Sequence, residues 1–484
     1  MKIIKTLILL YLLPTLLFSA LLYDVPVELK QPDGSTLHCY ASGDEYYSRL
    51  HDQNDYTITQ SNEDGFYYYA ILENQTIIPS IYRADQNYNL AQLGFRKKVM
   101  IPQERYLEIR ERWWNGVETR DAPTTGTVNN LNVFIRFADE DEFGNARSYY
   151  DSYFNNENGP SMKHYFSEVS YDMLTVNTIH YPTSSMDSNL SYQDQYPRSY
   201  YQPYNAVTNP GGYTDSERTD REHTLLQNAI AFIESEVPDS LIIDSNNDGN
   251  VDNVTFLIYG VPGGWADLLW PHRWALYSVV SEIHGKRVWD YNFNMASGPY
   301  FSVGTLAHEF CHSLGAPDLY HYYNDTAPVA VGGWDVMDAS TDIPQWMSSY
   351  IKYRYFNWIE LQDASGGGTF ELNPLGQPDN NAYRLDSSNP NEYFIIEYRT
   401  QEGMYDSNAP GIDSGIVIYR VNDLYNGQGN AQGPPDELYV YRVGGTSTTS
   451  GVFASAVFSE EVGRTQFNDS TNPSCFLIRS IKSV

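Results

Sequence analysis

The spacing of hydrophobic residues divides the chain into parts with different secondary structure. Apolar residues recur every three or four positions over 224–237 and 303–314, which predicts two amphipathic helices. Largely apolar runs at 131–138 and 254–259, each ahead of one of these helices, predict buried strands. The middle of the chain is therefore expected to contain both helices and strands.

The parts on either side follow other patterns. Residues 21–122 mix short strand-like runs with turns and close with a charged helical stretch at 104–114. The polar, turn-rich segment 120–126 then predicts a linker. From about residue 370, short strands separated by Gly, Pro, Asn and Asp predict an all-β part. Its clearest strands are expected at 393–398, 415–421 and 438–443.

The first residues have the order of features that marks a secretory signal peptide. Within residues 1–20, two lysines precede an apolar run broken by Pro14, and the small residues Ser19 and Ala20 follow. The run is short for a retained membrane anchor, which is the alternative, and no later stretch is apolar enough to span a bilayer. The sequence predicts a secreted, extracellular protein without a membrane span after signal removal.

Composition narrows the class of protein further. Of the 484 residues, 41% are hydrophobic and 15% aromatic, which is enough to build a packed core. The formal net charge of −31 disfavours nucleic acid as a partner, because like charges repel. Cys39, Cys311 and Cys475 are odd in number and widely spaced, so no disulfide framework is expected. Without such a framework, an exported chain of this size is expected to depend on its hydrophobic core and on bound metal ions for stability.

One short segment contains the candidate metal ligands and the candidate general base. His308 and His312 lie one turn apart on the predicted helix, so both imidazoles can bind one cation. Glu309 is placed to reach the metal-bound water and act as general base. Gly315 is typical of a helix end, and the chain that turns after it can carry Asp318 back to the metal. Two imidazoles, one carboxylate and an open position indicate a catalytic zinc site.

The third ligand has alternatives in the sequence. Asp318 stands where the long zinc motif of the metzincins has its third His. His321 and Asp335 remain possible, whereas a Glu on a later helix does not, because the next Glu along the chain is Glu360. The tight turn around Met337 matches the metzincin Met-turn, in which a thioether lies beneath the zinc without binding it.

A second metal signal precedes the strand at 254–259. Side-chain oxygens at positions 1, 3, 5 and 9, a carbonyl at position 7 and a glycine at position 6 are typical of a loop that wraps calcium. Position 12 is Thr255 and not a bidentate carboxylate, which indicates a stabilising site, not a sensor. A polar Asn/Asp turn without calcium is the alternative. The predicted calcium ligands are Asp244, Asn246, Asp248, Asn250 and Asp252.

Three further residues have a structural and a functional interpretation. His272, in the run 270–274, is either a contact to substrate or to the metal site, or a structural histidine among tryptophans. Cys39 is by default a buried strand cysteine, although a thiolate there can also cap zinc before activation. Cys311 lies between the ligand positions of the zinc helix and is interpreted as a packing residue.

These motifs resemble those of a known family, the immune inhibitor A family of secreted zinc metalloproteases. The zinc segment is the most specific part of the resemblance, which extends from about residue 25 to about residue 420. Cys311 departs from the family pattern, which more often has Gly or Ala there. The segments that carry the resemblance are 308–320, 334–337, 244–252, 270–274, 31–34 and 41–45.

The resemblance implies a fold and a division of the chain. The expected fold class is α+β, a metzincin-like metalloprotease domain with an N-terminal pro-domain and a C-terminal all-β domain. His308, His312 and Asp318 would then bind zinc, and Glu309 would be the catalytic base. The expected parts are a signal peptide at 1–20, an inhibitory pro-domain at 21–122, a catalytic domain with the calcium loop at 123–362 and a β-rich domain at 363–484.

The predicted function is that of a secreted zinc endopeptidase, made as a zymogen, that acts on proteins or peptides. One alternative is a calcium-dependent secreted binding or adhesion protein with an inactive protease fold. The intact Glu309 argues against it, because an inactive relic does not need the base. The other alternative is a zinc hydrolase that acts on a non-peptide amide.

Overall fold

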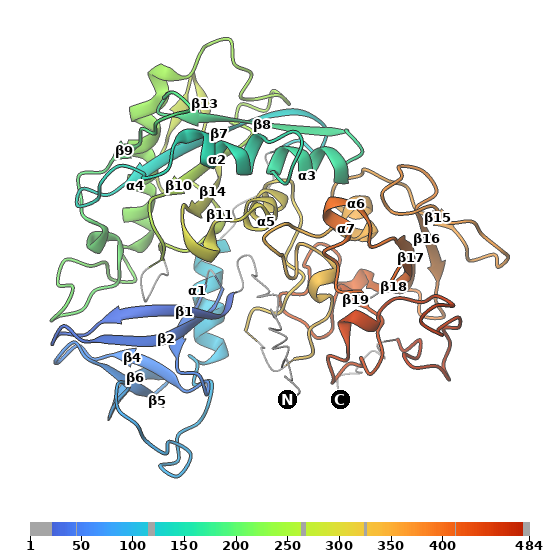
Figure 1. The fold of residues 1–484 in the computed structure, drawn as a ribbon, viewed down its shortest axis with the longest axis horizontal. Helices are drawn as coiled ribbons and strands as arrows, with labels where there is room; N and C mark the ends of the chain where they lie inside the picture. The colour runs from blue at the N-terminus through green and yellow to red at the C-terminus, as the bar shows by residue number, and fades with distance from the viewer. Residues whose placement is uncertain are drawn as a thin grey trace, which may run out of the picture.

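The computed structural model describes residues 22–44, 46–114, 122–262, 268–323, 327–411 and 413–477. Most of its strands belong to three sheets that follow one another along the chain (Figure 1). The predicted signal peptide lies outside the described residues. Within them, every helix is too short or too polar to cross a membrane.

The first sheet is an antiparallel meander in which each strand pairs with the next. Its hydrophobic cluster includes Cys39, Leu50 and Ile58. Helix α1 (Gln103–Trp114) follows where a helix is predicted, and its Tyr106 is buried in the core of the middle part. The strands are β1 (Leu22–Lys30), β2 (Thr36–Gly43), β3 (Ser48–His51), β4 (Thr57–Gln60), β5 (Tyr67–Glu73) and β6 (Thr76–Arg83).

The second sheet is mixed, with the strand order β11-β14-β10-β7-β8. Four of these five strands are parallel, and the edge strand β11 runs antiparallel to β14. The short β9 pairs with the end of β7, and β12 and β13 form a separate two-stranded ribbon. The strands are β7 (Gly126–Arg136), β8 (Leu174–Tyr181), β9 (Tyr192–Gln193), β10 (Val254–Ile258), β11 (His272–Ala275), β12 (Glu282–Ile283), β13 (Lys286–Arg287) and β14 (Asp290–Met295).

Helices cover both faces of this mixed sheet because its central strands are apolar on both sides. On β7, Val133 and Ile135 pack in the cluster that contains α4, whereas Phe134 packs in the cluster that contains α2, α3 and α5. This alternation is the period of two that a strand imposes on its side chains. The helices are α2 (Arg147–Asn155), α3 (Met162–Val169), α4 (Arg218–Ile233) and α5 (Val303–Ser313).

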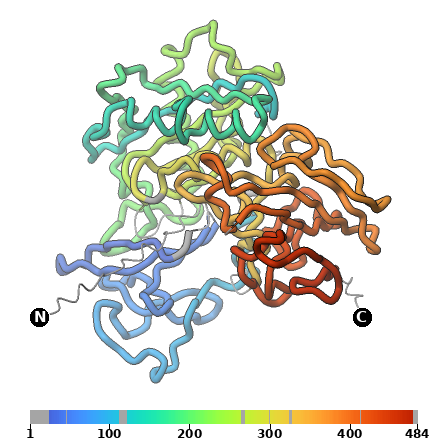
Figure 2. Tube along the Cα trace, turned by 45° about the vertical axis from the view of Figure 1, so that its right-hand side comes forward, coloured from blue at the N-terminus to red at the C-terminus, as the bar shows by residue number. Residues whose placement is uncertain are grey.

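The third sheet has the order β15-β16-β17-β18-β19 and lies beyond α5 (Figure 1). The strands predicted in this part of the chain are present, although the last is shorter than expected. Figure 2 shows this part and the first sheet as two lobes on the same side of the mixed sheet. The elements are β15 (Gln362–Asp363), β16 (Ala382–Asp386), β17 (Glu392–Arg399), β18 (Gly415–Asn422) and β19 (Leu438–Val440), with helices α6 (Ser349–Arg354) and α7 (Gly403–Asp406).

The third sheet shares its hydrophobic core with the zinc helix. Phe310 of α5, Met337, Ile395 of β17 and Tyr419 of β18 belong to one cluster. The core is therefore continuous across the predicted domain boundary at residue 362, which stays a prediction.

The end of the predicted linker is packed as well. Ala122 is buried, and the indole N–H of Trp358 donates to the carbonyl of Thr124 at 2.7 Å. Strand β7 begins at Gly126, soon after these contacts. Turn-forming residues predict an irregular backbone here, but they do not predict whether that backbone is exposed.

Candidate metal centre

Helix α5 has well-defined ends that place the residues of the motif. At its start, the hydroxyl of Ser302 accepts a hydrogen bond from the backbone N–H of Thr305 at 3.0 Å, which is an N-cap. At its end, Gly315 has a φ of +99°, and its N–H donates to the carbonyl of His312. The N–H of the next residue donates to the carbonyl of Cys311, which completes a Schellman motif. The chain then turns sharply, as the glycine predicts.

The turn brings the three predicted zinc ligands together. Nε2 of His308 lies 3.1 Å from Nε2 of His312, and Oδ1 of Asp318 lies 3.1 and 3.2 Å from these two atoms. Among the described residues, these three side chains are the one group of three or more His, Cys, Asp or Glu whose ligand atoms lie close enough together to bind a single metal ion. All three side chains are shielded from solvent, His312 the least.

Hydrogen bonds to the backbone set the tautomer of both histidines. Nδ1 of His308 lies 2.9 Å from the carbonyl of Val336, and Nδ1 of His312 lies 2.8 Å from the carbonyl of Ala316. A carbonyl only accepts hydrogen bonds, so each Nδ1 carries the proton and each Nε2 presents a lone pair. This is the arrangement by which proteins orient histidines toward a metal.

The donor set fits a zinc ion. A triangle with edges of 3.1–3.2 Å has a circumradius of about 1.8 Å, so a point about 2.0–2.1 Å from all three atoms exists about 1 Å outside their plane. Burial lowers the pKa of His308, but the neighbouring carboxylates of Asp318 and Glu309 together raise it overall. The two imidazoles likewise hold the pKa of Asp318 well below its usual range, against the effect of burial. The carboxylate is thus anionic and ready to bind a cation.

The other two candidates for the third ligand are engaged elsewhere. Nε2 of His321 lies 2.6 Å from a carboxylate oxygen of Asp436, in the part of the chain that forms the third sheet. Asp335 accepts a hydrogen bond from the backbone N–H of Ser348 at 2.7 Å. Neither side chain belongs to the metal cluster. The geometry therefore favours Asp318 among the three residues.

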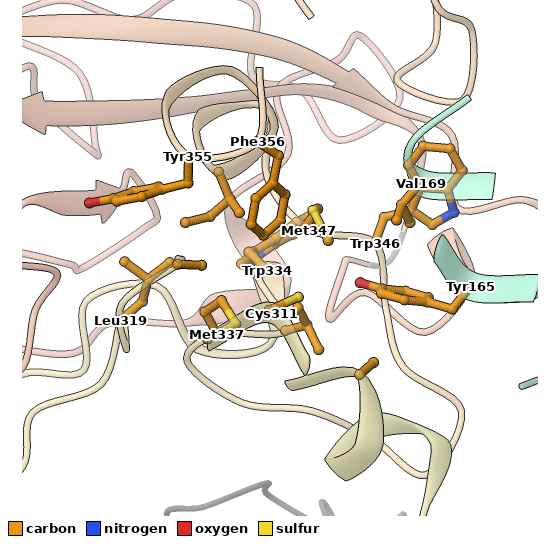
Figure 3. Packing of buried hydrophobic residues seen from close by; sticks show 14 of the residues in the cluster. Tyr165, Val169, Cys311, Leu319, Trp334, Met337, Trp346, Met347, Tyr355 and Phe356 are labelled. Atoms are coloured by element: carbon orange, nitrogen blue, oxygen red, sulfur yellow. The ribbon is translucent and has the colours of Figure 1, made fainter. Parts of the chain in front are cut away.

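The predicted turn around Met337 lies against the site. The short 3-10 helix Gly332–Trp334 precedes it, and the N–H of Met337 donates to the carboxylate of Asp335 at 2.8 Å. Figure 3 shows Met337 and Cys311 in the same packed cluster, and both are fully buried. The carbonyl of Val336, next to Met337, accepts the hydrogen bond that orients the first histidine. Cys311 is a packing residue, as predicted.

A cavity of about 270 Å³ opens beside the cluster. Glu309 and two of the predicted ligands line it, together with the edge strand β11 and residues 427–432. Tyr46 and Arg110, from the region predicted to be the pro-domain, line it too. The predicted base therefore faces the same space as the metal cluster, and the first part of the chain reaches into that space.

The structure favours the structural interpretation of Cys39, whereas His272 has structural contacts and also lines the cavity beside the metal cluster. His272 lies in β11, where its Nδ1 is 2.7 Å from the carbonyl of Trp270 and its Nε2 is 3.0 Å from the buried carboxylate of Glu222. Both ring nitrogens are thus engaged within the protein. Cys39 lies in the core of the first sheet, where burial raises the pKa of its thiol to about 12.

Several polar residues that anchor the site were not singled out from the sequence. The side-chain amide of Asn292 donates to the carbonyl of Glu309 at 2.9 Å and to the hydroxyl of Ser313 at 3.2 Å. Asn430 is fully buried, and its backbone N–H donates to the carbonyl of Asp318 at 2.9 Å. A lone asparagine has no distinctive spacing, so only long-range contacts reveal such a role.

The predicted calcium loop folds as a tight turn ahead of β10. Asp244 accepts hydrogen bonds from the backbone N–H groups of Asp248 and Gly249 at 3.0 and 3.1 Å. Gly249 has a φ of +95°, a conformation that side chains disfavour, which explains a glycine at the sixth position. The ammonium group of Lys286 also donates to Asp244, at 2.6 Å.

The carboxylates of this loop do not converge as the zinc ligands do. Among the described residues, no metal-type group of three is found here. Asn246 and the backbone N–H of Asn250 each donate to Asp248, at 2.9 and 2.8 Å. Burial, reinforced by the charges of Asp244 and Asp248, raises the pKa of Asp252 to about 6. Calcium binding stays a prediction. The negative charge of the carboxylates in this loop favours it.

The similarity of this chain to known proteins is distant. No protein-family model and no curated protein matches the sequence. Among solved structures, the chain is similar to wild-type OgpA from Akkermansia muciniphila, with 10% identity and a TM-score of 0.25 over 64% of this chain and 92% of that one. It is also similar to metalloproteinase-II from Bacteroides fragilis, with 13% identity and a TM-score of 0.23 over 69% and 85%. Scores this low do not establish a shared fold.

Proposed function

We propose that the protein is a zinc-dependent endopeptidase with the metzincin-like fold expected from the sequence. The observation that carries the proposal is the convergence of Nε2 of His308, Nε2 of His312 and Oδ1 of Asp318 within 3.2 Å of one another, beside a cavity that Glu309 also lines. Membership of the immune inhibitor A family is part of this proposal and rests on the motifs that resemble it.

Each group of the site has a defined task in peptide hydrolysis. A bound zinc ion supplies Lewis acidity that polarises the scissile carbonyl and lowers the pKa of water. Glu309 takes a proton from the attacking water and delivers it to the leaving amine. The hydrogen bonds from His308 to Val336 and from His312 to Ala316 hold the imidazoles in place during this transfer.

We also propose that the chain is made as an exported zymogen. The support for latency is steric. Tyr46 and Arg110 line the cavity that contains Glu309, so a substrate cannot fill that space while they do. Arg110 lies over the ring of Tyr322, 5.2 Å from its centre, and the ring of Tyr46 lies 5.1 Å from the same ring. The support for export is the signal-like pattern at 1–20.

Metal removal tests this proposal. The chain is first activated by limited proteolysis, and casein hydrolysis is then measured with zinc content determined on the same sample. A zinc chelator is expected to abolish hydrolysis, and added zinc is expected to restore it. His308→Ala should lose both zinc and activity. Full activity in a zinc-free sample would contradict the proposal.

Calcium at the loop 244–252 is proposed as a second, stabilising ion. An ion that binds the folded chain alone stabilises it by about 2.7 kcal/mol at one hundred times its dissociation constant, which raises Tm by a few degrees in a chain of this size. We expect a calcium chelator that spares zinc to lower Tm by a few degrees. Asp248→Ala should show no such response, whereas Asp239→Ala, at an exposed carboxylate outside the loop, should respond like the parent. An equal response in both variants would contradict the assignment.

A further inference from the structure

The two carboxylate oxygens of the third ligand have different neighbours. Oδ1 of Asp318 faces the two imidazoles, at 3.1 and 3.2 Å from their Nε2 atoms. Oδ2 accepts a hydrogen bond from the phenol of Tyr322, four residues further along the chain. The backbone carbonyl of Asp318 accepts from the N–H of Asn430 at 2.9 Å. The carboxylate therefore cannot turn without losing a hydrogen bond.

The position of Tyr322 is itself fixed by packing. The side chain is buried, and its ring lies 5.3 Å from that of Tyr320 and 5.1 Å from that of Tyr46. A buried phenol requires a hydrogen-bond partner, and here that partner is the metal ligand itself. Because the ring is held independently, its hydroxyl acts as a fixed donor toward Asp318.

We propose that Tyr322 is a positioning residue that makes Asp318 present one oxygen to the metal. This rests on the proposed function, because it assumes a zinc ion at His308, His312 and Asp318. A carboxylate that is free to rotate can offer both oxygens to one ion and fill the position that water needs. With Oδ2 occupied by the phenol, Oδ1 alone is available, and the open position is preserved.

The same residue links the ligand to the first part of the chain. Tyr46 and Arg110 pack on the ring whose hydroxyl holds Asp318. The predicted pro-domain thus covers the support of the third ligand in addition to the cavity. A substitution that removes the hydroxyl but keeps the ring leaves this covering contact in place, so the two roles can be separated.

The test compares Tyr322→Phe with Tyr323→Phe in the full chain. Tyr323 is the next residue, and its hydroxyl donates to the carbonyl of Ile101 at 2.9 Å, not to a metal ligand. Outer-shell partners of metal ligands typically change metal affinity 10–100-fold, so zinc affinity by chelator competition is expected to fall about 10–100-fold in Tyr322→Phe. It should stay within about twofold of the parent in Tyr323→Phe, where no ligand contact is lost.

A spectroscopic readout separates positioning from general loosening. In the cobalt-substituted proteins, a second carboxylate oxygen on the metal raises the coordination number and weakens the visible absorption band. We expect a weaker band in Tyr322→Phe and an unchanged band in Tyr323→Phe, with equal Tm for the metal-free proteins. Parent-like zinc affinity and spectrum in Tyr322→Phe would overturn the inference. A parent chain that binds no zinc, or that binds it equally well as His308→Ala, would instead overturn the proposed function.

Discussion

Replacing Glu309 with alanine is expected to lower casein hydrolysis by the activated protein about 10²–10⁴-fold, the usual contribution of a general base. Glu309 lines the cavity beside the metal cluster, but its carboxylate is not one of the three gathered ligand groups. The variant should therefore keep the zinc content of the parent. Activity and bound zinc are measured on the same preparations, so that loss of the base and loss of the metal are distinguished.

Glu360→Ala is the matched control for this experiment. Glu360 is the next glutamate along the chain and is exposed, outside the cavity. We expect its substitution to leave both activity and zinc content at parental values. Parental activity in Glu309→Ala at full zinc occupancy would remove Glu309 from the catalytic role, and a binding protein with a protease-like fold would then become the better interpretation.

The centre of the site could be predicted from sequence because its geometry is local. His308 and His312 belong to one helix, and the turn that returns Asp318 depends on Gly315 in the left-handed conformation. Helical periodicity and helix-end chemistry are properties of neighbouring residues. The spacing therefore carries nearly all the information needed to bring three ligand atoms together.

The support of the site could not be predicted in this way. Asn430 is more than one hundred residues from Asp318, yet its backbone N–H holds the carbonyl of that ligand. Asn292, on β14, holds the carbonyl of Glu309 from another direction. Such contacts depend on how the sheets pack, and a single sequence gives no pairing between distant residues. The partner of a polar residue therefore becomes visible only in the folded chain.

The packing of the third sheet beside the site is a second feature that could not be predicted from the sequence. Its strands were predictable from short apolar runs separated by turn residues, but the packing of the sheet against the rest of the chain was not. Arg399 of β17 is fully buried, and its guanidinium lies 3.1 Å from Glu397 and 2.5 Å from Asp406. Glu397 in turn accepts the N–H of Ser349, at the start of α6. This charged network ties the third sheet to the segment after the metal-site turn, so the β-rich part is built into the core beside the zinc helix.

Contacts between the first part of the chain and the rest extend beyond the cavity. Arg105 of α1 forms an ion pair with Asp215 at 3.1 Å, and the side-chain amide of Asn205 donates to the carbonyl of Ser61 at 3.1 Å. The exposed ion pair contributes little on its own. The buried contacts of Tyr46 and Tyr106 add to these polar contacts, and covalent attachment is expected to reinforce the blockade by keeping the first part close to the cavity.

Cutting this attachment is expected to activate the protein. A covalent tether holds a blocking segment at an effective concentration of about millimolar, and cleavage makes the contact bimolecular. A recognition sequence for a specific protease is placed at residues 115–121. Before cleavage, casein hydrolysis should be near background. After cleavage and dilution to about micromolar protein, occupancy of the cavity by Tyr46 and Arg110 can fall by up to about 10³-fold, and activity should rise with dilution.

Two controls show whether the activity comes from the site and whether the blockade is intramolecular. The cleaved Glu309→Ala variant should stay inactive at every dilution, because an open cavity without the base lacks the proton acceptor that hydrolysis needs. The uncleaved parent should show no dependence of specific activity on dilution, since its blockade is intramolecular. An uncleaved chain as active as the cleaved one would contradict latency, because Tyr46 and Arg110 would then line the cavity without excluding the substrate.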